Sequence, residues 1–170
     1  MLVNGGESLK IRTMENPVHL AAFNAMGAAP TPMAWPEVIS SLQQGVIDGQ
    51  ENPLSVIVSV KLDEVQEYLT LSGHVYSPAM LLVSQPFWDS LDDDQKAAFE
   101  KAAADAVTAM RAYVDDVETT GVETLKERGM KVNELSTEQK AAFQESIASA
   151  YEGYYETYGK DLVDSIVNFK

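Results

Sequence analysis

Residues 92–128 carry an almost unbroken helical pattern, longer than any other pattern in the chain. Asp92 followed three residues later by Gln95 is typical of a capping box at a helix start. At about 1.5 Å of rise per residue the helix would be roughly 50 Å long, which exceeds the width of a small domain. It should therefore bridge two lobes or brace one against the other. Its apolar face consists of Phe99, Ala102, Ala103, Ala106, Val107, Met110, Tyr113, Val114 and Val117.

Before this helix the pattern alternates between strand and helix. Extended segments are predicted at 9–14, 46–51, 68–74 and 80–84, and helices at 17–26, 36–45 and 53–69. Such alternation favours an α/β fold. After Gly129 a short strand is predicted at 130–132, and a second capping box, Ser136 with Gln139, opens a helical tail that runs to Val167.

The composition excludes several functional classes. With 26 acidic and 12 basic residues among 170, the formal charge of −14 repels nucleic acid and anionic membrane surfaces, so no nucleic-acid partner is expected. The absence of cysteine excludes disulfides, thiolate nucleophiles and iron–sulfur clusters within this sequence. Residues 1–9 have neither a basic run nor an apolar core, so any secretion signal is expected outside this sequence.

Motifs of the common enzyme classes are absent from the sequence. It has no Gly-x-Ser-x-Gly elbow, no phosphate-binding glycine loop and no His-Glu-x-x-His zinc motif. His19 and His74 lack a metal-ligand spacing, and we interpret both as structural. We therefore predict neither enzymatic activity nor a cofactor. A carboxylate-dependent hydrolase remains a remote alternative, which loss of activity on Glu51→Gln would revive.

Arg12 is the most informative single residue. It is the only arginine before Arg111, and it stands in the middle of the strand predicted at 9–14. A guanidinium in this place is suited to bidentate recognition of a carboxylate. The alternative is an arginine on the solvent-facing side of an edge strand.

Three helices are predicted to begin near Pro17, Pro36 and Pro53, each after an extended segment. If the connections behave as in open α/β sheets, the N-termini of these helices lie on one rim. The free N–H groups gathered there would favour an anion, even in an acidic protein.

Four further residues near these junctions are candidates for ligand binding. Asn52 and Asn16 either present their amides to a ligand or cap the helices that follow them. Trp35 either lines a pocket or packs into the core. Glu15, which precedes Asn16, is included in the same candidate set.

One run of residues in this sequence is highly specific, Asp48-Gly49-Gln50-Glu51-Asn52-Pro53. It is accompanied by characteristic segments at residues 9–12, 27–38, 42–47, 64–66, 73–78 and by the long helix. Together these segments closely resemble one family, the extracytoplasmic solute-binding proteins of tripartite ATP-independent periplasmic (TRAP) transporters, of the DctP type. The resemblance covers nearly everything from Leu9 onward.

The resemblance implies a two-lobed α/β protein of the type II-like periplasmic-binding class, with a mixed sheet, a long lobe-bridging helix and C-terminal helices. It implies a periplasmic protein that closes around a small organic acid and delivers it to TRAP membrane subunits, without cofactor or catalysis. The ligand would be a dicarboxylate, a sugar acid or a 2-oxo acid. In the family, the residue matching Arg12 pairs with the ligand carboxylate, the one matching Asn52 hydrogen-bonds the same group, and the one matching Trp35 lines the pocket.

Two departures from the family pattern stand out. Members usually carry serine at the position of Pro36, and they are roughly twice as long as this chain, which lacks most of the first lobe. We expect an N-terminal leader at 1–8, a ligand-contacting α/β core at 9–78, and an inter-lobe strand, long helix and helical tail at 79–170. Without its first-lobe partners, apolar surface at residues 80–83 and on the long helix should be exposed and favour a homodimer. The alternative function is a remnant that does not close on ligand and acts only by pairing with another chain.

Overall fold

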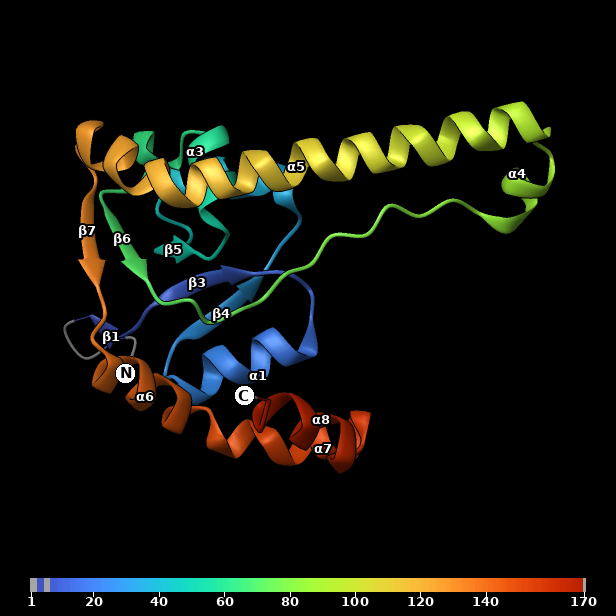
Figure 1. Cartoon of the computed structure of the whole chain (residues 1–170). Coiled ribbons are helices and arrows are strands. Elements are labelled where there is room, and N and C mark those ends of the chain that lie inside the picture. Colours follow the sequence, from blue (N-terminus) through green and yellow to red (C-terminus); the bar gives the residue numbers. More distant parts are fainter. Residues whose placement is uncertain (1–2, 5–6, 170) are drawn as a thin grey trace.

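The computed structural model describes residues 3–4 and 7–169. Small sheets lie between a long helix on one side and a layer of C-terminal helices on the other (Figure 1). The predicted α/β class is confirmed. Of the expected leader at 1–8, residues 1–2 and 5–6 lie outside the described part, while β1 (Val3–Asn4) and β2 (Glu7–Ser8) pair in antiparallel fashion.

A three-stranded parallel sheet forms the centre of the first half of the chain. Its order is β4-β3-β5, from β4 (Ala29–Pro32), β3 (Lys10–Thr13) and β5 (Gly49–Gln50). The connections pass through α1 (Pro17–Ala25), and through η1 (Trp35–Glu37) with α2 (Val38–Gln43). Each connection carries the chain back to start another parallel strand, as strand–helix–strand units require. The predicted alternation of strand and helix up to β5 is confirmed.

The helix predicted at 53–69 ends early. α3 spans only Leu54–Ser59, and Lys61 then adopts a left-handed conformation with a φ of 54°. This turn ends the helical path, and a short 3₁₀ helix, η2 (Leu62–Glu64), leads to β6 (Tyr68–Leu71). The prediction was wrong beyond α3. Leu62 keeps the apolar spacing of a helix and is buried, but it lies in η2, after the turn at Lys61.

β6 pairs in parallel with β7 (Lys131–Glu134), and the crossover between them contains α4 (Gln85–Asp89) and α5 (Asp93–Glu127). The predicted mixed sheet does not form within the described residues, because each of their sheets is purely parallel or purely antiparallel. The strand predicted at 80–84 is also wrong, since residues 72–84 have no regular structure. No neighbouring strand of the described chain pairs with this segment. Its apolar residues are exposed as predicted, Leu82 to 81%.

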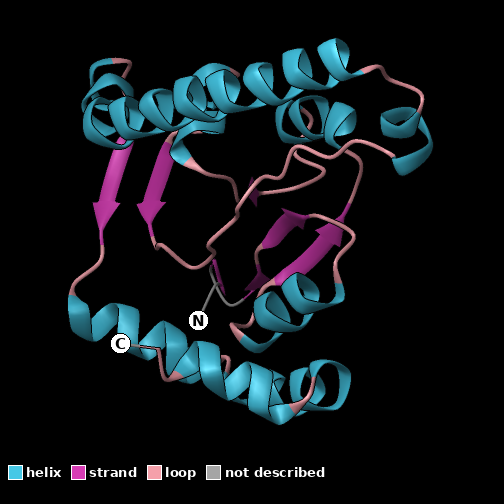
Figure 2. Ribbon diagram, turned by 45° about the vertical axis from the view of Figure 1, so that its right-hand side comes forward, coloured by secondary structure: helices cyan, strands magenta, loops and turns pink. Residues whose placement is uncertain are grey.

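The long helix α5 is confirmed, with 35 residues. An Asp92 carboxylate oxygen accepts from the Gln95 N–H at 2.8 Å, and the Gln95 side chain accepts from the Asp92 N–H at 3.0 Å. The C-terminal half of α5 packs on α3, and its N-terminal half projects beyond the sheets (Figures 1 and 2). Within residues 3–4 and 7–169, no helix combines the length and apolar character of a membrane span.

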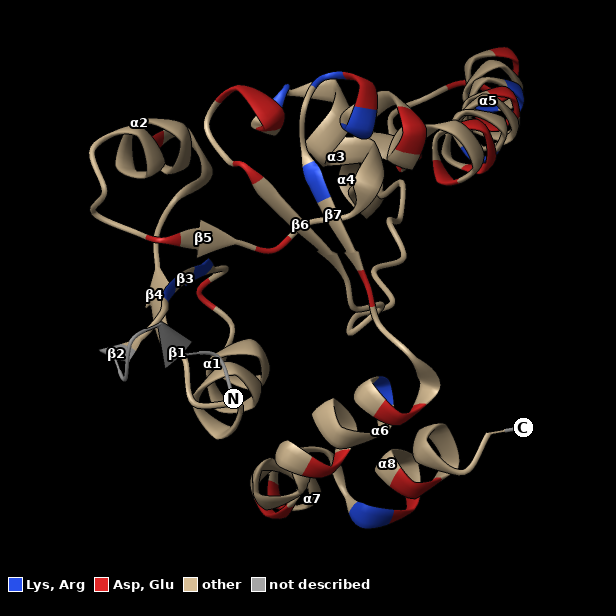
Figure 3. Cartoon of the chain, turned by 90° about the vertical axis from the view of Figure 1, so that its left-hand side faces the viewer, with Lys and Arg blue, Asp and Glu red and all other residues tan. Residues whose placement is uncertain are grey.

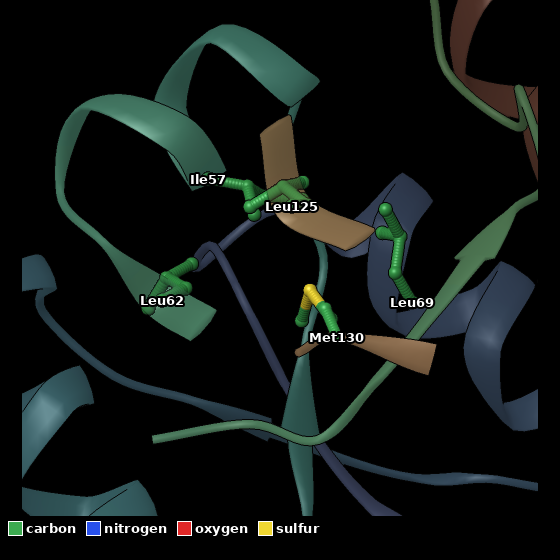
Figure 4. Packing of buried hydrophobic residues seen from close by; sticks show 5 residues of the cluster. All are labelled: Ile57, Leu62, Leu69, Leu125 and Met130. Carbon is green, nitrogen blue, oxygen red and sulfur yellow. The ribbon is translucent and has the colours of Figure 1, made fainter. Parts of the chain in front are cut away.

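The main core lies where α5 meets α3 and the β6–β7 pair. Its buried members are Ile57, Leu62, Leu69, Leu125 and Met130, whose side chains converge from four elements and the turn after α5 (Figure 4). This cluster joins segments that are more than 50 residues apart in the sequence, so it is the tertiary contact that holds α5 in place.

The helical tail forms as predicted but in pieces. A capping box at Ser136 and Gln139 starts α6 (Thr137–Ser146), and η3 (Ala148–Ala150), α7 (Tyr151–Tyr158) and α8 (Lys160–Val167) follow. These helices pack against α1, where the Tyr154 hydroxyl donates to the Val18 carbonyl oxygen at 2.9 Å. Phe143 and Ile147 cover a second buried cluster made by Phe23, Met26 and Ala28. The tail thus shares a core with segment 9–78.

Candidate ligand-binding site

The candidate site lies at one edge of the β4-β3-β5 sheet. Because the three strands are parallel, their C-terminal ends meet at this edge, and α1, η1 and α3 begin shortly after it. Arg12 is level with Thr31 of β4 and with Gln50 of β5. The sheet topology therefore brings together the three helix starts that the prolines indicated.

Arg12 is buried, with only 5% of its surface exposed. Its Nε and Nη2 atoms donate to the Met33 carbonyl oxygen at 3.1 and 2.9 Å. Among the described residues, none accepts a hydrogen bond from Nη1. The alternative of a solvent-facing arginine is wrong. The carbonyl holds one edge of the guanidinium and leaves other N–H groups to bind an anion.

Trp35 packs into the core, one of the two roles considered for it, and it also contacts Arg12. Its ring centroid lies 5.6 Å from Arg12 Cζ, within the range of a cation–π contact. Its other surface packs against the main core cluster. Trp35 therefore links the guanidinium of Arg12 to the main core and helps to fix its position.

The two asparagines differ in how the fold uses them. Asn52 does not cap α3, which begins after Pro53 without a side-chain cap; instead its Nδ2 donates to Gln50 Oε1. Asn16 is the cap of α1, since its Oδ1 accepts from the Val18 N–H at 2.8 Å, and only its Nδ2 group remains for a ligand. Glu15 is exposed and forms no hydrogen bond or ion pair within the described residues. Gln50, which orients Asn52, was missed in the sequence.

Glu51 joins the two histidines, an arrangement that the sequence did not reveal. Its Oε1 lies 3.6 Å from His19 Nδ1, and its Oε2 lies 3.4 Å from His74 Nε2. The His74 ring also meets Phe23 edge-on at 5.5 Å, and its Nδ1 lies 2.8 Å from Ser72 Oγ. These contacts hold the segment 72–84, which follows β6, against α1 and against the edge of the β4-β3-β5 sheet where Glu51 lies. The only available signal was the position of Glu51 beside Asn52, because the histidines are 55 residues apart.

The environment of Glu51 favours its charged form. Burial acts to raise the pKa of Glu51, but the hydrogen bond with His74 and the charges of His74, His19 and Arg12 outweigh burial. Together they hold the pKa below the ordinary value of 4.5. A group whose pKa is lowered on folding stabilises the fold above its unfolded-state pKa, and this contribution is lost as the pH falls through the folded-state value.

We expect Glu51→Gln to lower the free energy of unfolding by about 1–3 kcal/mol at pH 6, because the charge-assisted hydrogen bond with His74 and the attraction to His19 are lost. The difference from the unchanged chain should shrink as the pH falls from about 4.5 through the lowered folded-state pKa of Glu51, because residue 51 is then neutral in both proteins. Urea unfolding at pH 6 and pH 3 measures both values. Glu64→Gln is the matched control, since Glu64 is exposed and pairs only with Lys61 at 3.8 Å; its effect should stay within about 0.5 kcal/mol. An equal loss at both pH values for Glu51→Gln would contradict the ionic role.

Comparisons with known proteins agree with this architecture. Residues 4–157 match the family model of bacterial extracellular solute-binding proteins, family 7 (DctP). A solute-binding protein of Verminephrobacter eiseniae is 45% identical over 160 residues, covering 94% of this chain and 47% of its relative. This chain thus spans about half the length of the curated relatives it matches.

Solved structures agree in fold. A TRAP periplasmic solute-binding protein from Bordetella bronchispeptica is 54% identical, with a TM-score of 0.86 over 95% of this chain and 53% of that one. A protein from Polaromonas sp. JS666, bound to D-erythronate, is 44% identical, with a TM-score of 0.87 over the same shares. The family match over most of the chain and these structural likenesses show that the chain belongs to the DctP family of bacterial extracellular solute-binding proteins.

Proposed function

We propose that this chain binds a small organic carboxylate through Arg12 as part of the solute-binding component of a TRAP transporter. The observation that carries the proposal is the buried guanidinium at the rim, held along one edge by a carbonyl that does not neutralise its charge. Glu51 acts on Arg12 only at longer range, because the pair forms no ion pair within 4 Å. A buried cation is stabilised by a hydrogen-bonded anion, and a carboxylate fits the planar guanidinium best.

Relatives support the ligand class. The Rhodobacter capsulatus relative is a C4-dicarboxylate-binding periplasmic protein, and related structures contain succinate and galactonate. The acids that these proteins bind differ in their remaining groups but share a carboxylate. For this chain we propose a dicarboxylate, a sugar acid or a 2-oxo acid.

Each candidate residue then has a distinct role. Arg12 provides the charge, the amide of Asn52 hydrogen-bonds the same carboxylate, and Trp35 covers the aliphatic part of the ligand. Asn16 offers its Nδ2 group and Glu15 accepts from ligand hydroxyls, whereas a second ligand carboxylate near Glu15 would be repelled. The role is binding in the periplasm and delivery to TRAP membrane subunits, with no catalysis and no cofactor.

A thermal-shift screen of the purified chain against small organic acids tests this proposal. Saturation at about 100 times the Kd adds about 2.7 kcal/mol of stability, which raises the melting temperature by several degrees. The matched control for each acid is its methyl ester, which keeps the shape but removes the charge and should give no shift. A folded sample that responds to no acid would overturn the proposal.

A second candidate function is association without ligand binding. The observation in its favour is the exposed apolar surface on residues 80–83 and on the N-terminal half of α5. Such a surface is unusual on a monomeric protein and is typical of an interaction site.

A further inference from the structure

The edge of the β4-β3-β5 sheet at which Arg12 lies carries more negative than positive charge. Three segments leave this edge, residues 14–16, 33–37 and 51–53, and each contains one acidic residue and no lysine or arginine. The three acids are Glu15, Glu37 and Glu51. With one positive and three negative charges, and both histidines neutral, the net charge of this edge is −2.

Other basic residues are absent from the elements that surround this edge. α1, α2, α3 and the segment 72–84 contain no lysine or arginine, and the loop after β5 carries an acidic but no basic segment (Figure 3). Lys10 shares β3 with Arg12, but it is exposed and stands two residues earlier, about 6.6 Å toward the opposite edge of the sheet. The edge therefore presents one positive charge, which one carboxylate neutralises.

The acids act on a ligand through charges that no cation offsets. Burial acts to raise the pKa of Glu51, but the hydrogen bond with His74 and the nearby charges hold it below 4.5, so that this residue is ionised at neutral pH. Glu15 and Glu37 are exposed, and neither forms an ion pair in the part of the chain that the structure describes. A second anionic group on a ligand would meet like charge here, and the repulsion grows as the ligand excludes water.

The free polar atoms at this edge favour hydroxyl groups on the ligand. Asn52 Nδ2 donates to Gln50, while Asn52 Oδ1 accepts no hydrogen bond from the described residues. The Glu15 carboxylate is a second free acceptor. A ligand hydroxyl can donate to such atoms, whereas a second carboxylate would set acceptor against acceptor.

We propose that this edge of the sheet selects acids with a single carboxylate and several hydroxyl groups and discriminates against dicarboxylates. The inference rests on the proposed binding of a carboxylate by Arg12, and it narrows the ligand class to hydroxylated monocarboxylates such as sugar acids. Arg12 takes the carboxylate, and the three acids of this edge repel a second anionic group on the rest of the ligand.

Matched pairs of acids test the proposal on the purified chain. D-Erythronate and meso-tartrate share a four-carbon skeleton and differ only in one terminal group, CH₂OH in the first and a carboxylate in the second; D-gluconate and D-glucarate differ in the same way. At pH 8 the first acid of each pair is a monoanion and the second a dianion. In isothermal titration at low ionic strength, the dianion of the tighter-binding pair should have a Kd about tenfold or more above that of the monoanion. This ratio should fall as added salt screens the repulsion.

Removing the acids should remove the discrimination. Glu15→Gln and Glu37→Gln together should lower the ratio of the two Kd values about fivefold or more, mainly by tightening the dianion, because two of the three repelling charges are lost. The matched control is Glu100→Gln with Glu127→Gln. Both of these residues are exposed, lie on α5 and form no ion pair among the described residues, so the same change of net charge should leave the ratio within about twofold. Circular dichroism checks that each variant keeps its helix content.

The outcomes separate this inference from the function on which it rests. A dianion that binds as tightly as its matched monoanion, or a ratio that the double variant at residues 15 and 37 leaves unchanged, would overturn the inference and leave carboxylate binding in place. A folded chain that binds neither pair would also overturn it. Only a sample that responds to no acid in the thermal-shift screen would overturn the function itself.

Discussion

Replacing Leu125 with alanine is expected to lower the free energy of unfolding by about 3 kcal/mol. The Leu125 side chain is 0% exposed and packs among Ile57, Leu62, Leu69 and Met130. This cluster lies where α5 packs on α3 and on the β6–β7 pair, so the surroundings cannot close the cavity without moving α5 away from α3. The loss combines the transfer of the deleted methyl groups with the cavity that remains.

Urea unfolding followed by circular dichroism measures this loss. Leu162→Ala on α8 is the matched control, because that leucine is 55% exposed, and the same chemical change should cost less than about 1 kcal/mol. If the two substitutions cost the same, the α5–α3 contact would not be the main core of the chain.

Arg12→Ala should abolish the response to organic acids, with an affinity loss of about a hundredfold or more. Truncating one partner of a buried, hydrogen-bonded charge pair costs about 2–5 kcal/mol, which corresponds to this range. Arg12→Lys should recover only part of the affinity, because an ammonium group keeps the charge but cannot bind both carboxylate oxygens from one plane. Isothermal titration with the acid that gives the largest thermal shift measures each Kd.

Two controls separate binding from folding in this experiment. The melting temperature of each Arg12 variant without ligand shows whether loss of the contacts to Met33 and Trp35 has disturbed the rim. Arg128→Ala removes the same side chain from an exposed position, where it pairs with Asp63 at 3.3 Å, and should leave the affinity unchanged. An Arg12→Ala variant that folds and still binds the acid normally would place the carboxylate elsewhere.

Part of the candidate site could be predicted from local pattern alone. Arg12 stood out because it is the only arginine before Arg111 and lies in the middle of a short strand, and Pro17 and Pro53 marked the starts of α1 and α3 at this edge of the sheet. The contact between Glu51 and the two histidines could not be predicted in this way. It joins residues on three separate elements, and no periodicity relates such positions.

The sequence by itself determined the class of the fold, the extent of α5, the two capping boxes and the family, because these depend on patterns within a few residues or on a specific run such as 48–53. Only the tertiary structure decided where α3 ends, that residues 80–83 form no strand, and that Asn52 is held by Gln50 rather than capping its helix. The physical reason is that a strand needs a neighbour for its backbone, and a polar side chain takes whichever partner the fold places nearest. Both are supplied by residues far away in the chain.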